Sequence, residues 1–234
     1  NALISIGNYI NKWHIEVQTL GAINYMGNYK LQRRKFLSFA SLLPLFISNS
    51  SLRANDIYSI EKVLEPRYMG NVNAPIKFTE FVSFTCSHCA DFHINKLPTL
   101  KEKYIDKGLL RLELRDFPLD GLALRAAAMS RLVDQNKYYK FVEMLFNKQK
   151  NWSQSNQPIK ELRKLGRLAG LKKELLDASI DDLKLLEVIF KIRQQAEKKY
   201  NIQSTPSFVI NDKYFLSGNL SLEKFEKTFN KIDI

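Results

Sequence analysis

The chain has 234 residues, of which 45% are hydrophobic and 26% charged, and this balance excludes a disordered chain and a protein that spans a membrane several times. Two cysteines are too few for a disulfide-stapled mini-domain or for a structural zinc site made of cysteine pairs. The formal net charge is +12, but the densest basic stretch, residues 160–173, holds no aromatic side chain, so we interpret it as a solvated helix face and expect no nucleic-acid partner.

The first 54 residues are predicted to precede the folded part. Residues 1–25 form an extension without a recognisable signal. Residues 26–54 have the three-part layout of a secretory signal peptide: a basic segment with Arg33 and Arg34, an apolar stretch over residues 36–47, and then small residues. The general secretory route is favoured, and the similarity of the arginine pair and the following Phe-Leu to a twin-arginine signal leaves that route open. Export to the periplasm with cleavage of the signal peptide is therefore expected.

The folded part is predicted to open with a strand, a helix and a second strand. Residues 76–84 are rich in β-branched and aromatic side chains, which is typical of a strand. Apolar side chains recur every three to four positions in residues 87–107, as on one face of a helix, and residues 109–117 alternate as a second strand does. A strand, a crossover helix and a strand predict a parallel pair.

The middle of the folded part has helical periodicity and no strand pattern. The expected helices cover residues 122–133, 137–148, 159–169, 173–179 and 181–200. We interpret residues 119–200 as a helical block.

A hairpin and a last helix are predicted to close the chain. Asn211 and Asp212 tolerate a positive φ, so they favour a two-residue turn between two strands, residues 207–210 and 213–216. A helix over residues 222–232 follows, with Ser221 as its N-cap. The order βαβ, helices, ββα predicts an α/β protein.

Both cysteines lie in the motif Cys86-Ser87-His88-Cys89, at the junction of the first strand and the first helix. A helix N-terminus carries a partial positive charge, so it stabilises a thiolate at Cys86 and lowers the pKa of that thiol. A protonated His88 would add a second positive charge. Because a stabilised thiolate favours the reduced dithiol, the corresponding disulfide is a strong oxidant. Cys89, one turn inside the helix, is expected to resolve a disulfide formed at Cys86.

A metal site is the alternative use of this motif, since Cys86, Cys89, His88 and His93 are potential ligands close together in the sequence. We favour redox chemistry, because on a helix His88 points away from the two cysteines and His93 lies deeper along the helix. We interpret His93 as a helix-surface or packing residue. Covalent haem attachment requires His directly after the second cysteine, where this chain has Ala90. No stable metal is expected.

Two segments resemble the DsbA-like family of the thioredoxin superfamily. Residues 76–93, IKFTEFVSFTCSHCADFH, are similar to the active-site region of that family, and residues 203–209, QSTPSFV, are similar to its Thr-Pro loop. The resemblance covers about residues 60–234. It implies a thioredoxin-like fold in two parts, residues 55–118 and 201–234, and it identifies the helical block, residues 119–200, with an inserted helical domain between them.

The resemblance also implies roles for three further residues. In this family the proline is cis and packs against the cysteines, which implies that Pro206 does so and that Thr205 presents its backbone to an extended substrate segment. An ordinary trans proline is the alternative. The family has an acid on the first strand that accepts the proton of the buried cysteine, and Glu80 matches it. A solvent-facing Glu80 is the alternative.

We therefore expect a periplasmic thiol:disulfide oxidoreductase that introduces disulfides into unfolded or reduced exported proteins. Six residues are expected to form the site, with Cys86, Cys89, His88 and Glu80 catalytic and Thr205 and Pro206 binding the substrate. The resemblance implies a membrane quinone-linked protein as the reoxidising partner, and the exchange needs no bound cofactor. Two alternative functions stay open. One is a disulfide isomerase or reductase on the same fold, and the other is a non-enzymatic periplasmic metal-binding protein that uses the same cysteines.

Overall fold

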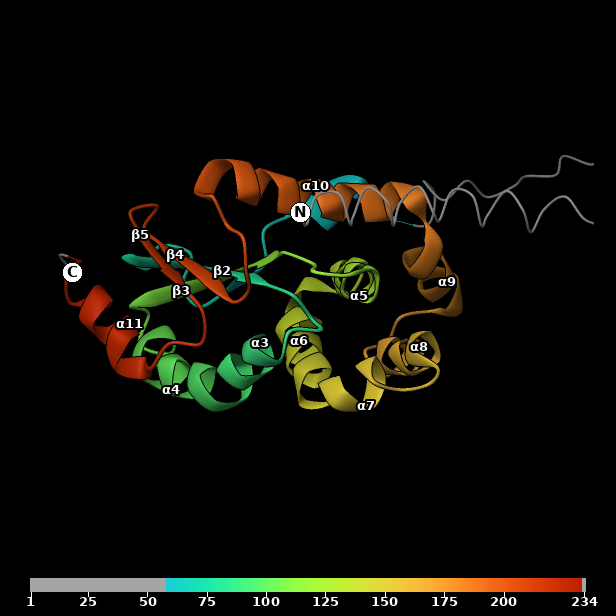
Figure 1. Ribbon diagram of the computed structural model, residues 1–234, viewed down its shortest axis with the longest axis horizontal. Coiled ribbons are helices and arrows are strands. Elements are labelled where there is room, and N and C mark those ends of the chain that lie inside the picture. Colours follow the sequence, from blue (N-terminus) through green and yellow to red (C-terminus); the bar gives the residue numbers. More distant parts are fainter. Residues whose placement is uncertain (1–57, 233–234) are drawn as a thin grey trace, which may run out of the picture. The chain divides into compact units, whose positions relative to one another are not determined.

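The computed structural model describes residues 58–232 (Figure 1). The predicted extension, residues 1–25, and the predicted signal peptide, residues 26–54, lie outside the described residues. Within the described range, the search for a helix of sufficient length and apolar character to span a membrane finds none.

A five-stranded sheet in the order β1-β3-β2-β4-β5 organises the fold. Its centre is β2 (Ile76–Val82), which pairs in parallel with β3 (Leu110–Asp116) and antiparallel with β4 (Ser207–Ile210). The parallel pair predicted from the crossover helix is therefore confirmed. The outer strands are β5 (Tyr214–Ser217), antiparallel to β4, and the two-residue β1 (Tyr68–Met69), antiparallel to β3.

The predicted hairpin turn between β4 and β5 is present. Asn211 and Asp212 have φ of 50° and 53°, in the left-handed region that both residues tolerate. The Asn211 side chain also accepts the backbone N–H of Lys77 at 2.7 Å, which ties the turn to β2. β1 was not predicted, because two residues are too few to show an alternating pattern.

The predicted helix over residues 87–107 is a continuous helical segment, but it is not uniformly α-helical. It consists of α3, the π-helical turn η2, α4 and a second π-helical turn η3, which cover Ser87–Asp91, Phe92–Lys96, Leu97–Leu100 and Lys101–Ile105. A π-helical turn inserts one extra residue per turn and changes which side chains face the sheet. The first of these turns begins three residues after Cys89, so it alters the surroundings of the redox motif.

Between β3 and β4 the described chain is helical. All the predicted helices are present, with ends shifted by up to two residues, and the short α7 and a 3₁₀ turn, η4, were not predicted. The elements are α5 (Gly121–Arg131), η4 (Gln135–Lys137), α6 (Tyr138–Asn147), α7 (Gln149–Ser153), α8 (Pro158–Leu168), α9 (Lys173–Asp181) and α10 (Leu183–Tyr200). Their assignment to a separate domain, residues 119–200, stays a prediction.

Two helices lie outside this block. α2 (Ile60–Leu64) precedes the sheet and was not predicted, and α11 (Leu222–Phe229) ends three residues earlier than expected. Ser221 stands at the N-cap of α11 as predicted, but its side chain makes no capping hydrogen bond. The start of α10 is better fixed, because the Asp182 carboxylate accepts the backbone N–H groups of Lys184 and Leu185.

Helices cover both faces of the sheet (Figure 1). On one face, Phe78 of β2 packs among aromatic rings of the segment after Cys89, of β4 and of α11, namely Phe92, Phe208, Phe225 and Phe229. On the other face, Phe81 and Val209 contact Ala196 of α10. Successive residues of a strand alternate between faces, so Glu80 shares the face of Phe78.

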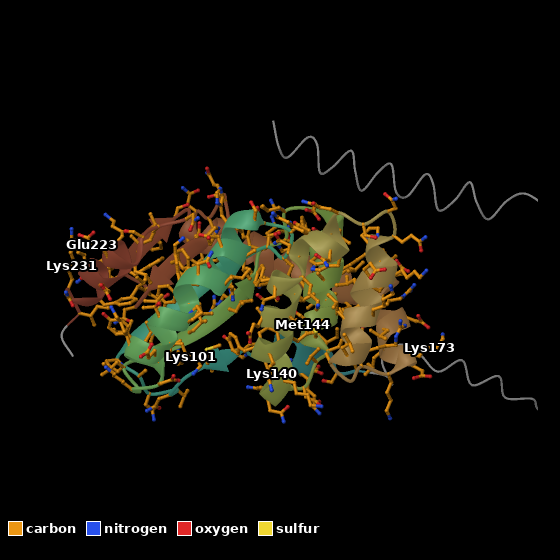
Figure 2. All side chains as sticks on the ribbon, turned by 90° about the horizontal axis from the view of Figure 1, so that it is seen from below. Lys101, Lys140, Met144, Lys173, Glu223 and Lys231 are labelled. Atoms are coloured by element: carbon orange, nitrogen blue, oxygen red, sulfur yellow. The ribbon has the colours of Figure 1, made fainter. Side chains whose placement is uncertain are left out.

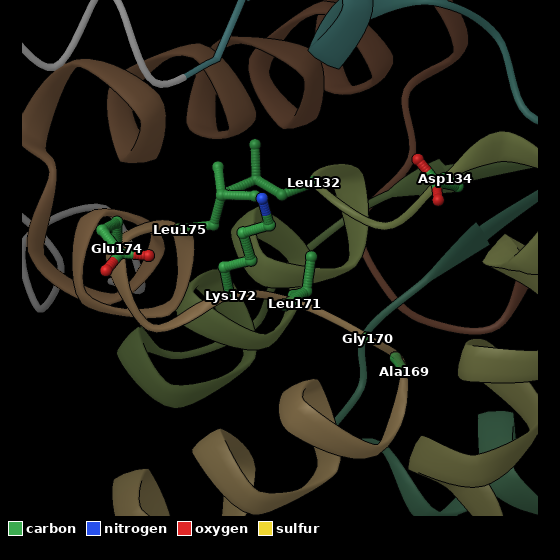
Figure 3. A pocket seen from close by; sticks show the side chains of 8 residues that line it. All are labelled: Leu132, Asp134, Ala169, Gly170, Leu171, Lys172, Glu174 and Leu175. Atoms are coloured by element: carbon green, nitrogen blue, oxygen red, sulfur yellow. The ribbon is translucent and has the colours of Figure 1, made fainter.

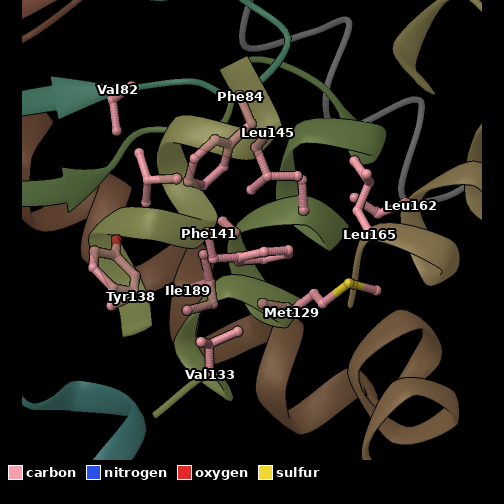
Figure 4. Close-up of a cluster of buried hydrophobic side chains, with 14 of the residues drawn as sticks. Val82, Phe84, Met129, Val133, Tyr138, Phe141, Leu145, Leu162, Leu165 and Ile189 are labelled. Carbon is pink, nitrogen blue, oxygen red and sulfur yellow. The ribbon is translucent and has the colours of Figure 1, made fainter. Parts of the chain in front are cut away.

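A second buried cluster joins the helical block to the end of β2 (Figure 4). Val82 and Phe84 pack there with Phe141 and Leu145 of α6. Cys89 belongs to the same cluster. The helical block therefore forms part of the wall around the second cysteine of the motif.

Charged side chains project from the surface of the described part (Figure 2). Labelled examples are Lys101, Lys140, Lys173, Glu223 and Lys231. In the basic stretch 160–173 the cations are exposed or half-buried and several pair with acids, namely Lys164 with Glu161 and both Arg163 and Lys173 with Asp177. This agrees with a solvated helix face.

Candidate active site

The two cysteines sit where β2 passes into α3. Cys86 occupies the N-cap position of α3 and is partly exposed, whereas Cys89 in the first turn is fully buried, at 0%. Both are free thiols in this structure. The loop between β2 and α3 is closed by a hydrogen bond from the Cys86 N–H to the Ser83 carbonyl oxygen at 3.1 Å. Only one of the two sulfurs is therefore open to a partner protein.

The helical block holds this loop in place. The side-chain amide of Gln149, in α7, donates to the carbonyl oxygens of Phe84 and Cys86, each at 2.9 Å. The Thr85 hydroxyl donates to the carboxylate of Asp120 at 2.6 Å, and the same carboxylate caps α5 by accepting the Ala123 N–H. Sequence reasoning does not find Gln149, because it lies 63 residues from Cys86 and belongs to no motif.

The environment of Cys86 favours its thiolate. The pKa of Cys86 is lowered to about 5, first by a hydrogen bond from the Cys89 thiol and also by the Thr205 hydroxyl and the backbone N–H groups of Cys89 and His88, while partial burial opposes the shift. The direction predicted from the helix N-terminus is thus present, but its largest cause is a neighbouring thiol, which the helix-terminus argument leaves out. Cys86 is therefore a thiolate at neutral pH.

Cys89 has the opposite properties. Burial raises its pKa well above the ordinary value, and the nearby Cys86 and the charge of Glu80 raise it further. A buried, protonated thiol is a poor nucleophile. Cys89 is therefore closed to direct attack by a partner protein, and its resolving role stays a prediction.

We expect the reduced protein to be alkylated by iodoacetamide at Cys86 alone. The rate should rise as the pH increases through about 5, because only the thiolate reacts, and then stay level toward neutral pH. Mass spectrometry of the modified peptide at each pH gives the profile, and the urea-unfolded chain, with a midpoint near the ordinary value of about 8.5, is the control. A folded-state midpoint close to that of the unfolded chain would contradict the described environment.

Glu80 points into the protein. It lies on the central strand with 0% exposure, so the alternative of a solvent-facing Glu80 is wrong. Its Oε2 lies 2.9 Å from Nε2 of His93, and its Oε1 is buried without a hydrogen-bond partner. Its charge is one of the causes, after burial and the hydrogen bond with Cys86, that raise the pKa of Cys89.

His93 differs from the sequence interpretation. It is 7% exposed, so it is not a surface residue, and besides packing it makes a buried hydrogen bond to Glu80. Its partner lies 13 residues earlier on a different element, so no local pattern indicates the contact. The structure thus adds a titratable residue next to the predicted site.

Thr205 lies beside Cys86, and Pro206 follows it immediately before β4. The peptide bond between them is cis, so the alternative of a trans proline is wrong. In its protonated form the Cys86 thiol donates to the Thr205 carbonyl oxygen, which lies 3.3 Å from the sulfur. The motif and the Thr-Pro loop, 119 residues apart in the sequence, therefore meet at one sulfur.

His88 is exposed, and it touches the site through its backbone. Its N–H group is among the donors that lower the pKa of Cys86. Water screens an imidazole charge at an exposed position. The predicted electrostatic effect of the His88 ring stays a prediction.

The described residues offer poor geometry for a metal centre. Among residues 58–232, no group of three or more His, Cys, Asp or Glu side chains is placed to hold a metal ion. Of the two imidazoles of the motif region, that of His88 is exposed, whereas that of His93 is buried with its Nε2 on Glu80.

A pocket of about 360 Å³ lies elsewhere, where the link from α8 to α9 faces the end of α5 (Figure 3). None of the six predicted site residues lines it. Its lining residues are Leu132, Asp134, Ala169, Gly170, Leu171, Lys172, Glu174 and Leu175. The predicted site residues therefore lie outside this pocket. The Cys86 sulfur lies where two loops meet at the surface, a position that a protein partner can reach.

Comparisons with known proteins agree with this geometry. A family model described as thioredoxin matches residues 62–231. The crystal structure of Wolbachia pipientis alpha-DsbA1 is 32% identical, with 72% of this chain and 91% of that chain covered and a TM-score of 0.66. Oxidised BdbD from Bacillus subtilis is 26% identical, with 74% and 94% covered and a TM-score of 0.64.

Relatives in Rickettsia are similar over a smaller share of their length. A protein of Rickettsia bellii, provisionally named a protein-disulfide oxidoreductase, is 30% identical over 173 residues, which are 71% of this chain and 67% of that protein. Relatives from Rickettsia typhi and Rickettsia prowazekii are matched over 53% and 60% of their own length. The chain thus spans between about half and two thirds of these curated relatives.

Proposed function

This chain belongs to the DsbA-like disulfide oxidoreductases of the thioredoxin family, and we propose that it introduces disulfide bonds into unfolded or reduced exported proteins in the periplasm. The observation that carries the proposal is the asymmetry of the two thiols. Cys86 is accessible and its pKa is about 5, whereas Cys89 is buried and its pKa is raised well above the ordinary value. A dithiol whose accessible sulfur is stabilised as a thiolate gives an oxidising disulfide.

The proposed reaction starts from the Cys86–Cys89 disulfide. A substrate thiolate attacks the Cys86 sulfur, the enzyme disulfide breaks, and its electron pair leaves on the Cys89 sulfur, which takes up a proton. A second substrate thiolate then attacks the substrate sulfur of the mixed disulfide. The substrate disulfide forms and Cys86 leaves as a thiolate. A thiol of low pKa is a good leaving group, so the pKa of about 5 favours this last step.

The remaining predicted site residues bind the substrate, exchange a proton or stabilise the thiolate in this reaction. We assign Thr205 and Pro206 to the binding of an extended substrate segment, because Thr205 borders the Cys86 sulfur and the cis bond joins Pro206 to it. Glu80 exchanges the proton of Cys89, a role supported by its burial and by its effect on that thiol. His88 contributes a backbone N–H group to the thiolate and, when protonated, a positive charge.

The cycle requires a second partner. After transfer both enzyme cysteines are reduced, so an oxidant must remove two electrons before the next round. The family resemblance supports a membrane quinone-linked protein in this role. Because disulfide exchange uses only sulfur atoms of the two proteins, no bound cofactor takes part in the proposed reaction.

The reduction potential of the Cys86–Cys89 pair tests the direction of transfer. We expect a value near the −120 mV known for DsbA itself, measured by equilibration with reduced and oxidised glutathione. A value near about −180 mV would favour a disulfide isomerase, and one near the thioredoxin value of about −270 mV would make the protein a reductase. Either of these would overturn the proposed oxidase role.

A further inference from the structure

His93 occupies a defined position between the strand with Glu80 and the helical block. It belongs to the π-helical turn η2, four residues after Cys89. One side of its ring stacks on Phe146 of α6, with centroids 4.4 Å apart and an interplanar angle of 29°. Its Nε2 meets Oε2 of Glu80 at 2.9 Å, and only 4% of its side chain is exposed. This burial keeps water away from the contact between the two side chains.

The two oxygens of the Glu80 carboxylate are not equivalent. Oε2 is engaged by His93, whereas Oε1 is buried and has no hydrogen-bond partner in the described structure. A buried polar atom without a partner is costly, so one in a native fold calls for an explanation. The charge of this carboxylate acts on Cys89, the thiol that must lose a proton in the resolving step. Oε1 is thus the free acceptor in the neighbourhood of that thiol.

We propose that His93 is a positioning residue that holds the Glu80 carboxylate by Oε2 and so leaves Oε1 as the acceptor for the Cys89 proton. The inference rests on the proposed function. It adds His93 to the site and gives the two carboxylate oxygens of Glu80 different roles. An ionised carboxylate can only accept, so Nε2 of His93 carries the proton of their shared bond. The hydrogen bond from Nε2 orients the carboxylate, while Phe146 only packs against one side of the imidazole.

The step that His93 supports is the closing of the enzyme disulfide. In a mixed disulfide between Cys86 and a partner, the S–H bond of Cys89 breaks and its proton passes to Oε1 of Glu80. The electron pair of the Cys89 sulfur forms the new bond to Cys86. The bond between Cys86 and the partner breaks, and its electron pair leaves on the partner sulfur as a thiolate. The partner disulfide is the oxidant, and the enzyme dithiol is oxidised.

The rate at which the Cys86–Cys89 disulfide closes can be measured directly. The reduced full chain is mixed with oxidised glutathione, quenched with acid at short times, and analysed by mass spectrometry for the mixed disulfide at Cys86 and for the closed enzyme disulfide. His93→Phe removes the donor and keeps a ring that can stack on Phe146. We expect it to slow the closing step roughly ten- to a hundredfold at neutral pH, which is less than the roughly hundred- to ten-thousandfold of full general acid–base assistance, because Glu80 itself remains. Formation of the mixed disulfide should keep its rate.

Two matched variants separate positioning from packing. His93→Gln keeps an amide donor that can bind Oε2, so it should restore most of the closing rate. Phe146→Leu weakens the stack and leaves the His93–Glu80 bond in place, so it should close at nearly the rate of the unaltered chain. If His93→Phe does not fold, His93→Asn, whose amide is too short to reach Oε2, replaces it with the same expectation.

The pH profile provides a readout that a structural role would not change. The titratable groups around Glu80 are His93 from η2, Cys89 from α3 and Tyr139 from α6. The pKa of Tyr139 is well above its ordinary value because of burial, so Tyr139 stays neutral throughout. In the unaltered chain the internal acceptor should make the closing rate nearly independent of pH around neutrality. In His93→Phe the rate should rise up to tenfold per pH unit, because solvent base then takes the proton.

The outcomes separate this inference from the proposed function. A closing rate in His93→Phe equal to that of the unaltered chain would overturn the inference, and so would equal slowing in His93→Gln and Phe146→Leu, which would indicate packing alone. Cys89→Ala is the independent check on the function. If this variant, first activated as a mixed disulfide with glutathione, captures no reduced protein substrate at Cys86, the proposed function fails, whatever His93 does.

Discussion

Replacing Cys86 by Ala is expected to abolish disulfide transfer, whereas replacing Cys89 by Ala is expected to arrest the protein as a mixed disulfide with its substrate. The difference follows from the structure of the pair. Cys89 is fully buried and protonated at neutral pH, so it cannot replace Cys86 as the sulfur that meets the substrate. A thiol whose pKa lies above the ordinary value of about 8.5 is about 3% or less ionised at pH 7, so the loss should be at least about thirtyfold.

The mixed disulfide accumulates in Cys89→Ala because the resolving thiol is missing. In the Cys89→Ala protein, Cys86 is reactive, but no second sulfur is available inside the enzyme to release the partner. The species is detected by incubating the variant, activated as a mixed disulfide with glutathione, with a reduced protein that has one accessible cysteine. Non-reducing electrophoresis and mass spectrometry then show a covalent complex that a reductant removes. The double variant without either cysteine is the control and should form none. Appreciable transfer by Cys86→Ala, or no complex with Cys89→Ala, would contradict the assigned roles.

The residues around Cys86 explain why it, and not Cys89, carries the charge. The Cys89 thiol, the Thr205 hydroxyl and two backbone N–H groups all stabilise the Cys86 thiolate. Burial first, and then the neighbouring Cys86 and the charge of Glu80, act against a negative charge at Cys89. A proton on Cys89 therefore strengthens the thiolate of Cys86, and the two thiols act as one unit. This supports assigning the reduced state as the stabilised one.

Sequence patterns were sufficient wherever the determining interactions are local. The parallel pair of β2 and β3 follows from one crossover helix, and the turn at Asn211 and Asp212 follows from two side chains that accept a positive φ. The position of Cys86 at a helix start is equally local. These features were predicted because residues a few positions apart specify them.

The contacts that surround the cysteines are not local, and the sequence did not reveal them. His93 binds a carboxylate 13 residues away, and Gln149 binds carbonyl groups 63 and 65 residues away. Single polar residues on helices look like surface residues until the tertiary structure buries them. The π-helical turn at Phe92–Lys96 also has no sequence pattern of its own, yet it contains His93.

Arg131→Met is expected to lower the free energy of unfolding by about 3–5 kcal/mol, because it leaves a buried carboxylate without its cation. The Arg131 guanidinium donates to Asp116 at 2.6 Å, and the two side chains are 4% and 0% exposed. It also donates to the carbonyl oxygens of Glu65 and Leu114, each at 3.2 Å. One cation thus ties the end of β3, the segment after α2 and the end of α5 together.

Urea denaturation of the oxidised protein, followed by far-ultraviolet circular dichroism, measures the effect. Lys173→Met is the matched control, since it removes an exposed cation from its pair with Asp177 and should cause no measurable loss. Adding Asp116→Leu to Arg131→Met should recover much of the lost stability, because the buried charge is then removed together with its partner. If Arg131→Met unfolds at the urea concentration of the unaltered chain, then the ion pair does not anchor α5. Since α5 begins at the Asp120 cap that binds Thr85, the active-site loop would then depend on other contacts for its position.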